Sequence, residues 1–311
     1  PAPAPPQARQ GDRFSPKRTQ NTVTEIDEDP VLPDEFCWLT LGEMKALLRE
    51  DNILNMDSRS VLSTISLIED GILDELAAGG MRDILPKLSE NGRKYLHSFL
   101  SRKTVHSIDG LLSWYTMQKT QWYLDVEWKP LSQLEGWRIG EMAIEGDKRF
   151  FSVIGVDVQA GTREVTHWMQ PLIKDVHVGL LAFVCQEIDG VLHFLVQAKV
   201  EPGNMDIIEL SPTVSCSNYE DVQTRPVRPF LFDELFGRDA RVHYDTLQSE
   251  EGGRFYQWQN RNMIVELPPE TRLSLPFNYV WMSLGQMKEF MRYGMFSIEA
   301  RSIISSISFI D

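Results

Sequence analysis

Positive charge is scarce in this 311-residue sequence, which has 31 Lys and Arg against 45 Asp and Glu and a net charge of −14 at pH 7. Non-specific binding to nucleic acid needs a basic face, so that class of partner is excluded, while a locally basic pocket for a phosphate remains possible. The longest apolar run, from Val178 to Val184, is far too short to span a bilayer. The opening PAPAPPQARQ lacks the apolar core of a secretory signal, so we expect a cytoplasmic protein with no membrane partner.

Cysteine and histidine are few and scattered. The cysteines Cys37, Cys185 and Cys216 form no CxxC pair, which fits a reducing compartment and argues against a zinc knuckle. The histidines form no HxH or HxxxH pair. They are His97, His106, His167, His177, His193 and His243. We therefore expect no metal centre.

The sequence contains an internal repeat. WLTLGEMKALLREDNILNMDSRSVLSTIS from Trp38 aligns with WMSLGQMKEFMRYGMFSIEARSIISSIS from Trp281 with a single one-residue gap. Upstream, QNTVTE ending at Glu25 resembles RNMIVE ending at Glu266, and both are interpreted as strands. Two unrelated amphipathic helices can share an apolar pattern, but they would not also share Trp, Gly, Met-Lys and Arg-Ser at matched positions. We interpret the chain as two copies of one module, of which the first keeps only its last strand and two helices.

Each copy predicts two short helices. Thr40-x-x-Glu43 and Ser283-x-x-Gln286 are capping boxes, which satisfy free N–H groups at a helix start. Apolar residues then recur at i, i+3 and i+4, as on one buried helix face. They are Met44, Leu47 and Leu48 in the first copy and Met287, Phe290 and Met291 in the second.

Two further pairs match between the copies. Arg59 and Arg301 lie just inside the start of the second helix. Trp38 and Trp281 directly precede the capping boxes, and we interpret both as core anchors.

Composition and periodicity divide the chain into four segments. We expect a disordered Pro-rich start over residues 1–18, the end of the first repeat over 19–68, a helical connector over 69–106 and a complete second repeat over 107–311. Residues 107–122 predict a helix. Strands are predicted over 149–158, 163–169, 178–188, 190–200, 206–210, 254–258 and 261–267.

Asp189-Gly190 predicts a two-residue hairpin between two of these strands. Strands followed by flanking helices indicate an α+β fold with a mixed or antiparallel sheet, accompanied by a partial copy of the same module.

Several segments of the second copy match one known family in the same order. They are REVTHWMQPL (163–172), GVLHFLVQAKVEPGN (190–204), IELSPTV (208–214), SNY (217–219), YDTLQSEEGGRFY (244–256) and NRNMIVE (260–266). Together they resemble the NDP-4-keto-6-deoxyglucose 2,3-dehydratases of deoxysugar biosynthesis. The resemblance runs from about Leu111 to the end of the sequence, and the truncated copy matches the end of the family's repeat.

The resemblance implies a fold, a reaction and partners. The fold would be Nudix-like, in two tandem copies, and the protein a homodimer. The substrate would be dTDP-4-keto-6-deoxyglucose, which loses its C2 hydroxyl and gains a C3 ketone, and a downstream 3-ketoreductase would consume the product. The chain departs from the family because the body of the first copy is missing. It also has no Nudix box, so a Nudix hydrolase is a weaker interpretation.

This reaction sets its own chemical requirements. The C4 ketone acidifies the C3 proton, so a base must remove that proton and a donor or cation must stabilise the enolate oxygen. An acid then protonates the departing C2 hydroxyl. The C3 ketone arises by tautomerisation, so we expect no cofactor. The diphosphate needs Arg, Lys or N–H groups, and the thymine an aromatic face or an amide.

Two clusters of candidate residues lie on predicted strands. Strand alternation places Arg163 and His167 on one face, with Gln170 nearby, and all three are candidate substrate-binding residues. The alternative is a solvent-facing strand edge.

The second cluster is Gln197, Lys199 and Glu201 on one strand face, followed by Asn204. Gln197 and Asn204 are candidates for substrate binding. Lys199 suits the enolate or the diphosphate, and Glu201 suits proton transfer; the alternative is a solvated face.

Two more clusters lie near predicted turns. Thr213, Asn218 and Tyr219 can contact a sugar or a base, or can equally serve turn chemistry.

The last cluster lies on both sides of Gly252-Gly253 in the sequence. Adjacent carboxylates at Glu250-Glu251 can split acid and base roles, with Glu251 as the catalytic candidate. Arg254 and Tyr256 would share a strand face as a phosphate contact and a phenol acid, and Asn260 and Arg261 would bind substrate. The alternative is an acidic turn before a strand.

We therefore predict a sugar-nucleotide 2,3-dehydratase, a carbon–oxygen lyase. The main alternative is a non-catalytic dTDP-sugar-binding or dimerisation remnant of the same family.

Overall fold

The computed structural model describes residues 6–8, 18–27, 30–65, 85–146, 151–161 and 163–310. Its centre is a seven-stranded sheet whose main path runs β11–β12–β7–β8–β13, with β10 paired to β7 and β9 to β8. The strands are β7 (Gly179–Ile188), β8 (Val191–Val200), β9 (Ile208–Ser211), β10 (Val214–Cys216), β11 (Arg241–Ser249), β12 (Gln259–Leu267) and β13 (Tyr279–Ser283). β12 runs parallel to β7 and the other pairs are antiparallel, so the predicted α+β class with a mixed sheet is confirmed.

The β7–β8 hairpin turns at Asp189 and Gly190, whose φ angles of 51° and 82° are both positive. Positive φ at both central residues is typical of the type I′ turn that this dipeptide predicts.

Both faces of the central strands are covered, because alternate residues of β7 and β8 enter two different cores. Phe183 and Phe194 lie in a cluster with residues of α5 (Glu90–Leu100), α6 (Ile108–Gln121), α8 (Leu284–Met291) and α9 (Ile298–Ser305). Val184 and Leu195 lie in a second cluster, which includes residues of α7 (Tyr219–Thr224) and the loop after it. This double burial explains why both strands are almost continuously apolar.

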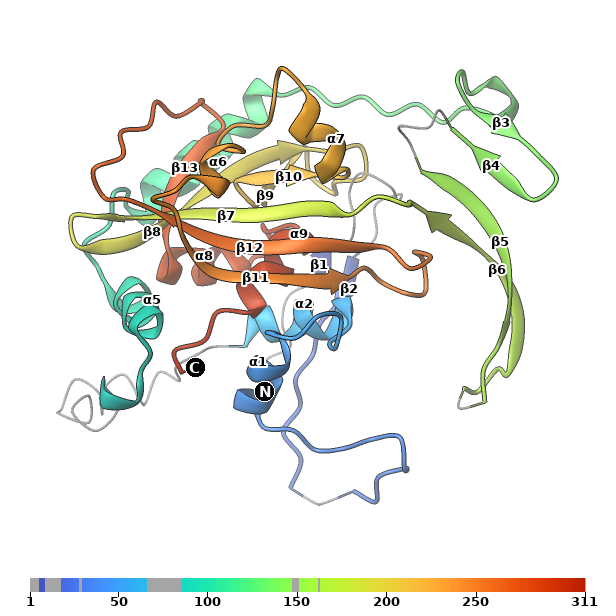
Figure 1. The fold of residues 1–311 in the computed structure, drawn as a ribbon, viewed down its shortest axis with the longest axis horizontal. Helices are drawn as coiled ribbons and strands as arrows, with labels where there is room; N and C mark the ends of the chain where they lie inside the picture. The colour runs from blue at the N-terminus through green and yellow to red at the C-terminus, as the bar shows by residue number, and fades with distance from the viewer. Residues whose placement is uncertain are drawn as a thin grey trace.

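A four-stranded antiparallel arm extends from one end of this body (Figure 1). It consists of β3 (Arg138–Ile139), β4 (Ala143–Glu145), β5 (Ser152–Gln159) and β6 (His167–Lys174). A small cluster of Ile173, Phe255, Trp258 and Phe151 joins it to the body. The arm leaves large apolar side chains in solvent, among them Met142 at 79% and Met169 at 74% exposure.

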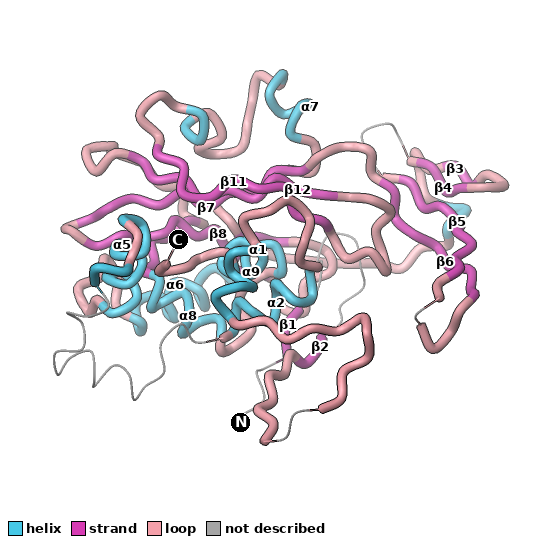
Figure 2. Tube along the Cα trace, turned by 60° about the horizontal axis from the view of Figure 1, so that its bottom comes forward, coloured by secondary structure: helices cyan, strands magenta, loops and turns pink. Residues whose placement is uncertain are grey.

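The two predicted helix pairs both form. α1 (Leu41–Leu47) and α2 (Met56–Thr64) correspond in sequence to α8 and α9, and both capping boxes are present. α2 packs against α9 (Figure 2), so the ends of the two copies meet through these helices. That the two copies arose by duplication remains a prediction.

Two expectations about the first copy are corrected. Trp281 is buried, but Trp38 is 63% exposed because no strand corresponding to β8 lies against it in the part of the chain that the structure describes. Residues 21–26 are not a strand; only β2 (Arg18–Gln20), just before them, pairs with β1 (Pro6–Ala8). The other residues of the Pro-rich start lie outside the described residues, as do residues 66–84, which include the last three of the predicted first repeat and the start of the connector.

The strands around 163–169 and 254–258 are also corrected. β6 begins only at His167. The backbone N–H groups of Arg254 and Phe255 both donate to Glu251 O at 2.9 Å, and Gln257 has a φ of 51°, so the segment after Gly253 is a turn. Sequence reasoning missed β3, β4, β10, β11 and β13.

Candidate functional site

A polar cavity of about 270 Å³ lies where four strand ends meet. In the register of the sheet, Asn260 at the start of β12 pairs with Gly179 at the start of β7, and Ser249 at the end of β11 pairs with Gln259. Since β8 is antiparallel to β7, its last residues reach the same edge. The cavity is lined by Leu181, Lys199, Glu201, Ser215, Cys216, Ser217, Glu250, Trp258, Asn260 and Glu299.

Lys199 and Glu201 form one charged wall of the cavity. The Lys199 ammonium pairs with Glu201 Oε1, and Glu201 is only 9% exposed. Asn204 Nδ2 donates to Lys199 O at 3.2 Å, which ties the turn after β8 to the strand. The Lys199 charge also acts on Cys216, although burial dominates and raises the pKa of that thiol to about 11.

Glu250 and Asn260 form a second wall. Glu250 is 5% exposed, its backbone N–H donates to Trp258 O at 2.9 Å, and its carboxylate accepts a hydrogen bond from Asn260 Nδ2. Gly179 makes room for this pair, because a Cβ there would lie 1.9 Å from Asn260 Oδ1. A glycine at this position therefore keeps the amide beside the carboxylate.

The cavity thus combines two buried carboxylates, an ammonium, an amide and a neutral thiol. Such a set can remove and return protons and can stabilise an oxyanion. Within the described part of the chain, no group of three or more His, Cys, Asp or Glu is placed to hold a metal ion. Within the same part, no helix has the length and apolar character that crossing a membrane requires.

Three of the sequence-predicted residues, Lys199, Glu201 and Asn260, meet in this cavity. Sequence reasoning recognised the Glu250-Glu251 pair but selected Glu251. The structure places Glu250 on the cavity wall and pairs Glu251 with Arg254 at 3.4 Å. No signal in the sequence separated the two, and none indicated Trp258, Cys216 or Glu299.

A second group of predicted residues lies at the turn beside the cavity. Gln170 Nε2 donates to Gly253 O at 2.8 Å and links β6 of the arm to this turn. Tyr256 is 37% exposed and its ring lies 5.8 Å from Lys174 Nζ. Because residues 254–256 are not a strand, the prediction that Arg254 and Tyr256 share a strand face was wrong.

Three predicted residues on the other side of the sheet have clear structural roles. Thr213 is 1% exposed, donates to Leu195 O and accepts from Val184 N. Asn218 caps α7 through a 3.0 Å bond from Asp221 N, and Tyr219 packs between Phe232 and Phe236.

The remaining predicted residues lie on strands or on the arm. Arg261 binds both oxygens of Asp245 at 2.6 and 2.7 Å. Gln197 sits between Ser211 and Tyr279 in the sheet.

Arg163 and His167 lie together neither on one strand face nor in the cavity. Arg163 lies in a bend over the Trp168 ring, 5.6 Å away, and His167 Nε2 is 2.6 Å from Asp157 Oδ1 on β5. The predicted shared face was wrong because the strand starts four residues later than expected.

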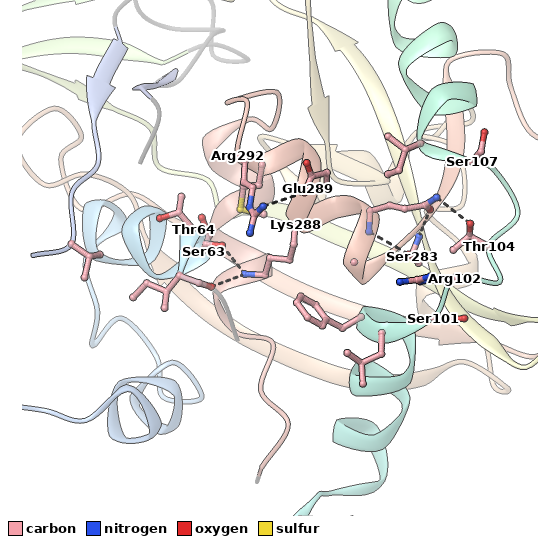
Figure 3. A pocket seen from close by; sticks show the side chains of 18 residues that line it. Ser63, Thr64, Ser101, Arg102, Thr104, Ser107, Ser283, Lys288, Glu289 and Arg292 are labelled. Carbon is pink, nitrogen blue, oxygen red and sulfur yellow. Dashed lines mark hydrogen bonds and ion pairs between the residues drawn. The ribbon is translucent and has the colours of Figure 1, made fainter. Parts of the chain in front are cut away.

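A larger hollow, of about 1050 Å³, lies beside α8 and contains none of these residues (Figure 3). Lys288 points from its wall to the end of α2, where it donates to Ser63 O at 2.7 Å. Ile65, the last residue before a gap in the described chain, also lines this hollow. Because the hollow contains none of the predicted site residues, we place the candidate site in the smaller cavity.

A separate buried network joins α5 to β11 and β12. Tyr95 Oη lies 2.8 Å from His243 Nδ1, and His243 Nε2 lies 2.8 Å from Glu266 Oε2. Lys94 Nζ donates to Glu266 Oε1 at 2.6 Å. An ionised Glu266 accepts a hydrogen bond from the Nε2–H of His243, and the Tyr95 hydroxyl, which can donate or accept, lies against Nδ1.

Comparison with known proteins extends over most of the chain. A family model described as NDP-hexose 2,3-dehydratase matches residues 5–65 and 108–307. A dTDP-4-dehydro-6-deoxy-alpha-D-glucopyranose 2,3-dehydratase of Saccharopolyspora spinosa is 41% identical over 311 residues, with coverage of 97% of this chain and 61% of the relative. The enzyme of the same name from Streptomyces violaceoruber is 37% identical, with coverage of 97% and 64%. The chain thus spans about three fifths of the length of these relatives.

Solved structures with some likeness include Nudix hydrolases. An ADP compounds hydrolase has a TM-score of 0.32 and 14% identity, with coverage of 50% of this chain and 83% of that chain. A Nudix hydrolase from M. smegmatis has a TM-score of 0.27 and 10% identity, with coverage of 48% and 90%.

Proposed function

Because this chain belongs to the NDP-hexose 2,3-dehydratase family, we propose that it acts on dTDP-4-keto-6-deoxyglucose and removes the C2 hydroxyl as water. The relatives named for this reaction are longer than the chain, which spans about three fifths of their length, and their names support the proposal. The observation that carries the proposal is the cavity that joins Lys199 and Glu201 to Glu250 and Asn260.

The proposed reaction uses the two carboxylates and the ammonium in sequence. One carboxylate, Glu201 or Glu250, takes the C3 proton, and the electron pair moves onto the C4 oxygen. Lys199 stabilises that enolate by charge, an effect that is stronger in a partly buried cavity than in open water. The electrons then return and expel the C2 hydroxyl, which leaves as water after protonation by the other acid. The resulting C3 enol tautomerises to the ketone, so the atoms balance without a redox cofactor.

The size of the cavity suggests how the substrate lies. Its volume of about 270 Å³ is just below the range of roughly 300–1,000 Å³ usual for sites that enclose a whole drug-sized ligand. We propose that it holds the hexose ring and that the diphosphate extends toward the adjacent turn. There Arg254, Tyr256 and Gln170 offer a cation, a phenol and an amide.

The test is a coupled assay. The chain is incubated with dTDP-4-keto-6-deoxyglucose, a 3-ketoreductase and NADPH, and the 2-deoxy product is measured. We expect product from the wild type and none from Glu201→Gln, Lys199→Met or Glu250→Gln. Glu251→Gln is the matched control, because it changes the neighbouring carboxylate outside the cavity, and it should keep most of the turnover.

A non-catalytic sugar-nucleotide-binding protein is the second candidate, favoured by the first-copy segment, in which residues 21–26 form no strand and Trp38 is 63% exposed. It would give no product while dTDP still raises the melting temperature. Such a result would disprove catalysis by this chain and leave binding.

We also propose a homodimer that forms through the arm, with cytoplasmic location and a downstream ketoreductase as expected context. The exposed Met142 and Met169 support an interface on the arm, since a thin sheet with exposed apolar side chains gains stability when covered. Light scattering of the wild type should give twice the 35.8 kDa mass of one chain. Met169→Glu should reduce the measured mass to that of a single chain.

A further inference from the structure

Arg59 belongs to the first-copy segment (residues 19–68), yet its guanidinium reaches the end of β11, directly before Glu250. It is 1% exposed and Nη2 donates to Ser249 O, the carbonyl directly before Glu250, at 2.5 Å. Nη1 donates to Gln248 Oε1 at 3.2 Å and also to Leu54 O. Burial lowers the pKa of Arg59, and the charge of Glu250 opposes that effect, so the guanidinium and the carboxylate attract each other.

The loop after α1 supports the same strand. Asn52 N donates to Leu247 O at 2.9 Å, and Leu247 N donates to Asp51 Oδ1 at 2.8 Å. Tyr244 Oη donates to Leu48 O at 2.7 Å. The outer edge of β11, which would otherwise carry unpaired backbone groups, is therefore held by residues 48–52 up to the point where Glu250 enters the cavity.

Arg301 provides a natural comparison, because it is also 1% exposed and faces Arg59 across the α2–α9 contact. Arg59 Nε donates to Ser302 Oγ at 2.8 Å, and Arg301 Nε donates to Ser60 Oγ at 3.0 Å. Asn262 and Asn21 donate to these same two hydroxyls. The two arginines thus make equivalent bonds between the helices, whereas Arg59 also holds Gln248 and Ser249.

We infer that Arg59 is a positioning residue for Glu250, so that the first-copy segment sets the geometry of the acid–base site in the second copy. The backbone of Glu250 is then fixed on both sides, by Arg59 at Ser249 O and by Trp258 O at its own N–H. A carboxylate that transfers protons must be held to within a fraction of an ångström or so. The first-copy segment therefore has a role in the site, a conclusion that rests on the proposed function.

The test compares Arg59→Lys with Arg301→Lys. Each variant shortens one buried cation and weakens one bond between the helices, so both should lose a similar amount of stability. Only Arg59→Lys also loosens Ser249, and it should lower the turnover of dTDP-4-keto-6-deoxyglucose by about tenfold, while Arg301→Lys stays within about twofold of the wild type. The coupled assay with the 3-ketoreductase measures turnover, and urea unfolding provides the folded fraction.

Amide hydrogen exchange at Glu250 gives a readout that needs no ligand. Exchange should be faster in Arg59→Lys than in Arg301→Lys, because only the former loosens Ser249 O in the same peptide group, so that the bond from the Glu250 N–H to Trp258 O opens more often. Equal exchange and equal turnover in the two variants would reduce Arg59 to a purely structural role and overturn the inference. If the wild type gives no product, the proposed function fails, and the exchange comparison still decides the positioning role.

Gln248→Met is the second variant in case Arg59→Lys does not fold. It removes one acceptor of Arg59 and leaves α2 unchanged. Faster exchange at Glu250 supports the positioning role, and wild-type exchange contradicts it.

Discussion

The buried ion pair of Glu266 predicts how the stability of this protein depends on pH. Burial by itself raises the pKa of Glu266, but the hydrogen bonds and charges of His243 and Lys94 outweigh burial and hold the pKa at about 2, against 4.5 for an ordinary glutamate. At about 1.4 kcal/mol for each pKa unit, the network contributes roughly 3 kcal/mol to the free energy of unfolding near neutral pH.

The direction of this pH dependence follows from the lowered pKa of Glu266. Because the folded pKa lies below the unfolded one, the stabilisation is complete above about pH 4.5 and is lost as the pH falls toward 2. Glu266→Gln keeps the shape and removes the charge. It should lower the free energy of unfolding by about 3 kcal/mol at neutral pH, and the difference from the wild type should shrink below about pH 4.5.

Urea unfolding of both proteins at a series of pH values measures this difference. Glu187→Gln is the matched control, because Glu187 faces the same Lys94 at 3.9 Å but is 38% exposed. A surface pair of this kind contributes under about 1 kcal/mol, so the control should follow the wild type at every pH. A constant gap between Glu266→Gln and the wild type from neutral pH to about 2.5 would refute the electrostatic account.

Three further predictions concern other buried groups. Burial lowers the pKa of Lys288 to about 7, so between about pH 7 and 10.5 the unfolded chain holds more protons than the folded chain. The free energy of unfolding of the wild type should therefore rise with pH in this range relative to that of Lys288→Met, as measured by urea titrations. Gly179→Ala places a Cβ against the Asn260 side chain and should separate that amide from Glu250. Turnover in the coupled assay should fall about tenfold or more, with little change in the free energy of unfolding. Unchanged turnover would remove Asn260 from the site. At about pH 8, iodoacetamide should label the exposed Cys37 and spare Cys185 and Cys216, whose thiol pKa values burial raises; mass spectrometry of the peptides would show any exception.

Local sequence patterns correctly predicted elements whose determinants lie within a few residues. Asp189-Gly190 fixes its hairpin because both residues tolerate positive φ. The boxes at Thr40 and Ser283 fix two helix starts, since donor and acceptor are three residues apart. Alternation also placed Lys199 beside Glu201, because two residues separate neighbours on one strand face.

Contacts between residues far apart in the sequence could be determined only from the tertiary structure. Whether Glu250 or Glu251 faces the cavity depends on the turn after β11 and on the seating of Asn260 against Gly179. His243 looked isolated in the sequence, since its partners Tyr95 and Glu266 are 148 and 23 residues away.

The sequence by itself determined that Lys199 and Glu201 lie together on one strand face and that Arg59 and Arg301 occupy matching positions in two similar helices. Only the tertiary structure decided that Arg59 lies against Ser249, 190 residues further along the chain, and that the ends of four strands enclose one polar cavity. The physical reason is that capping, turns and alternation act over a few bonds. A buried guanidinium instead takes whichever carbonyl the packing of α2 on α9 brings to it.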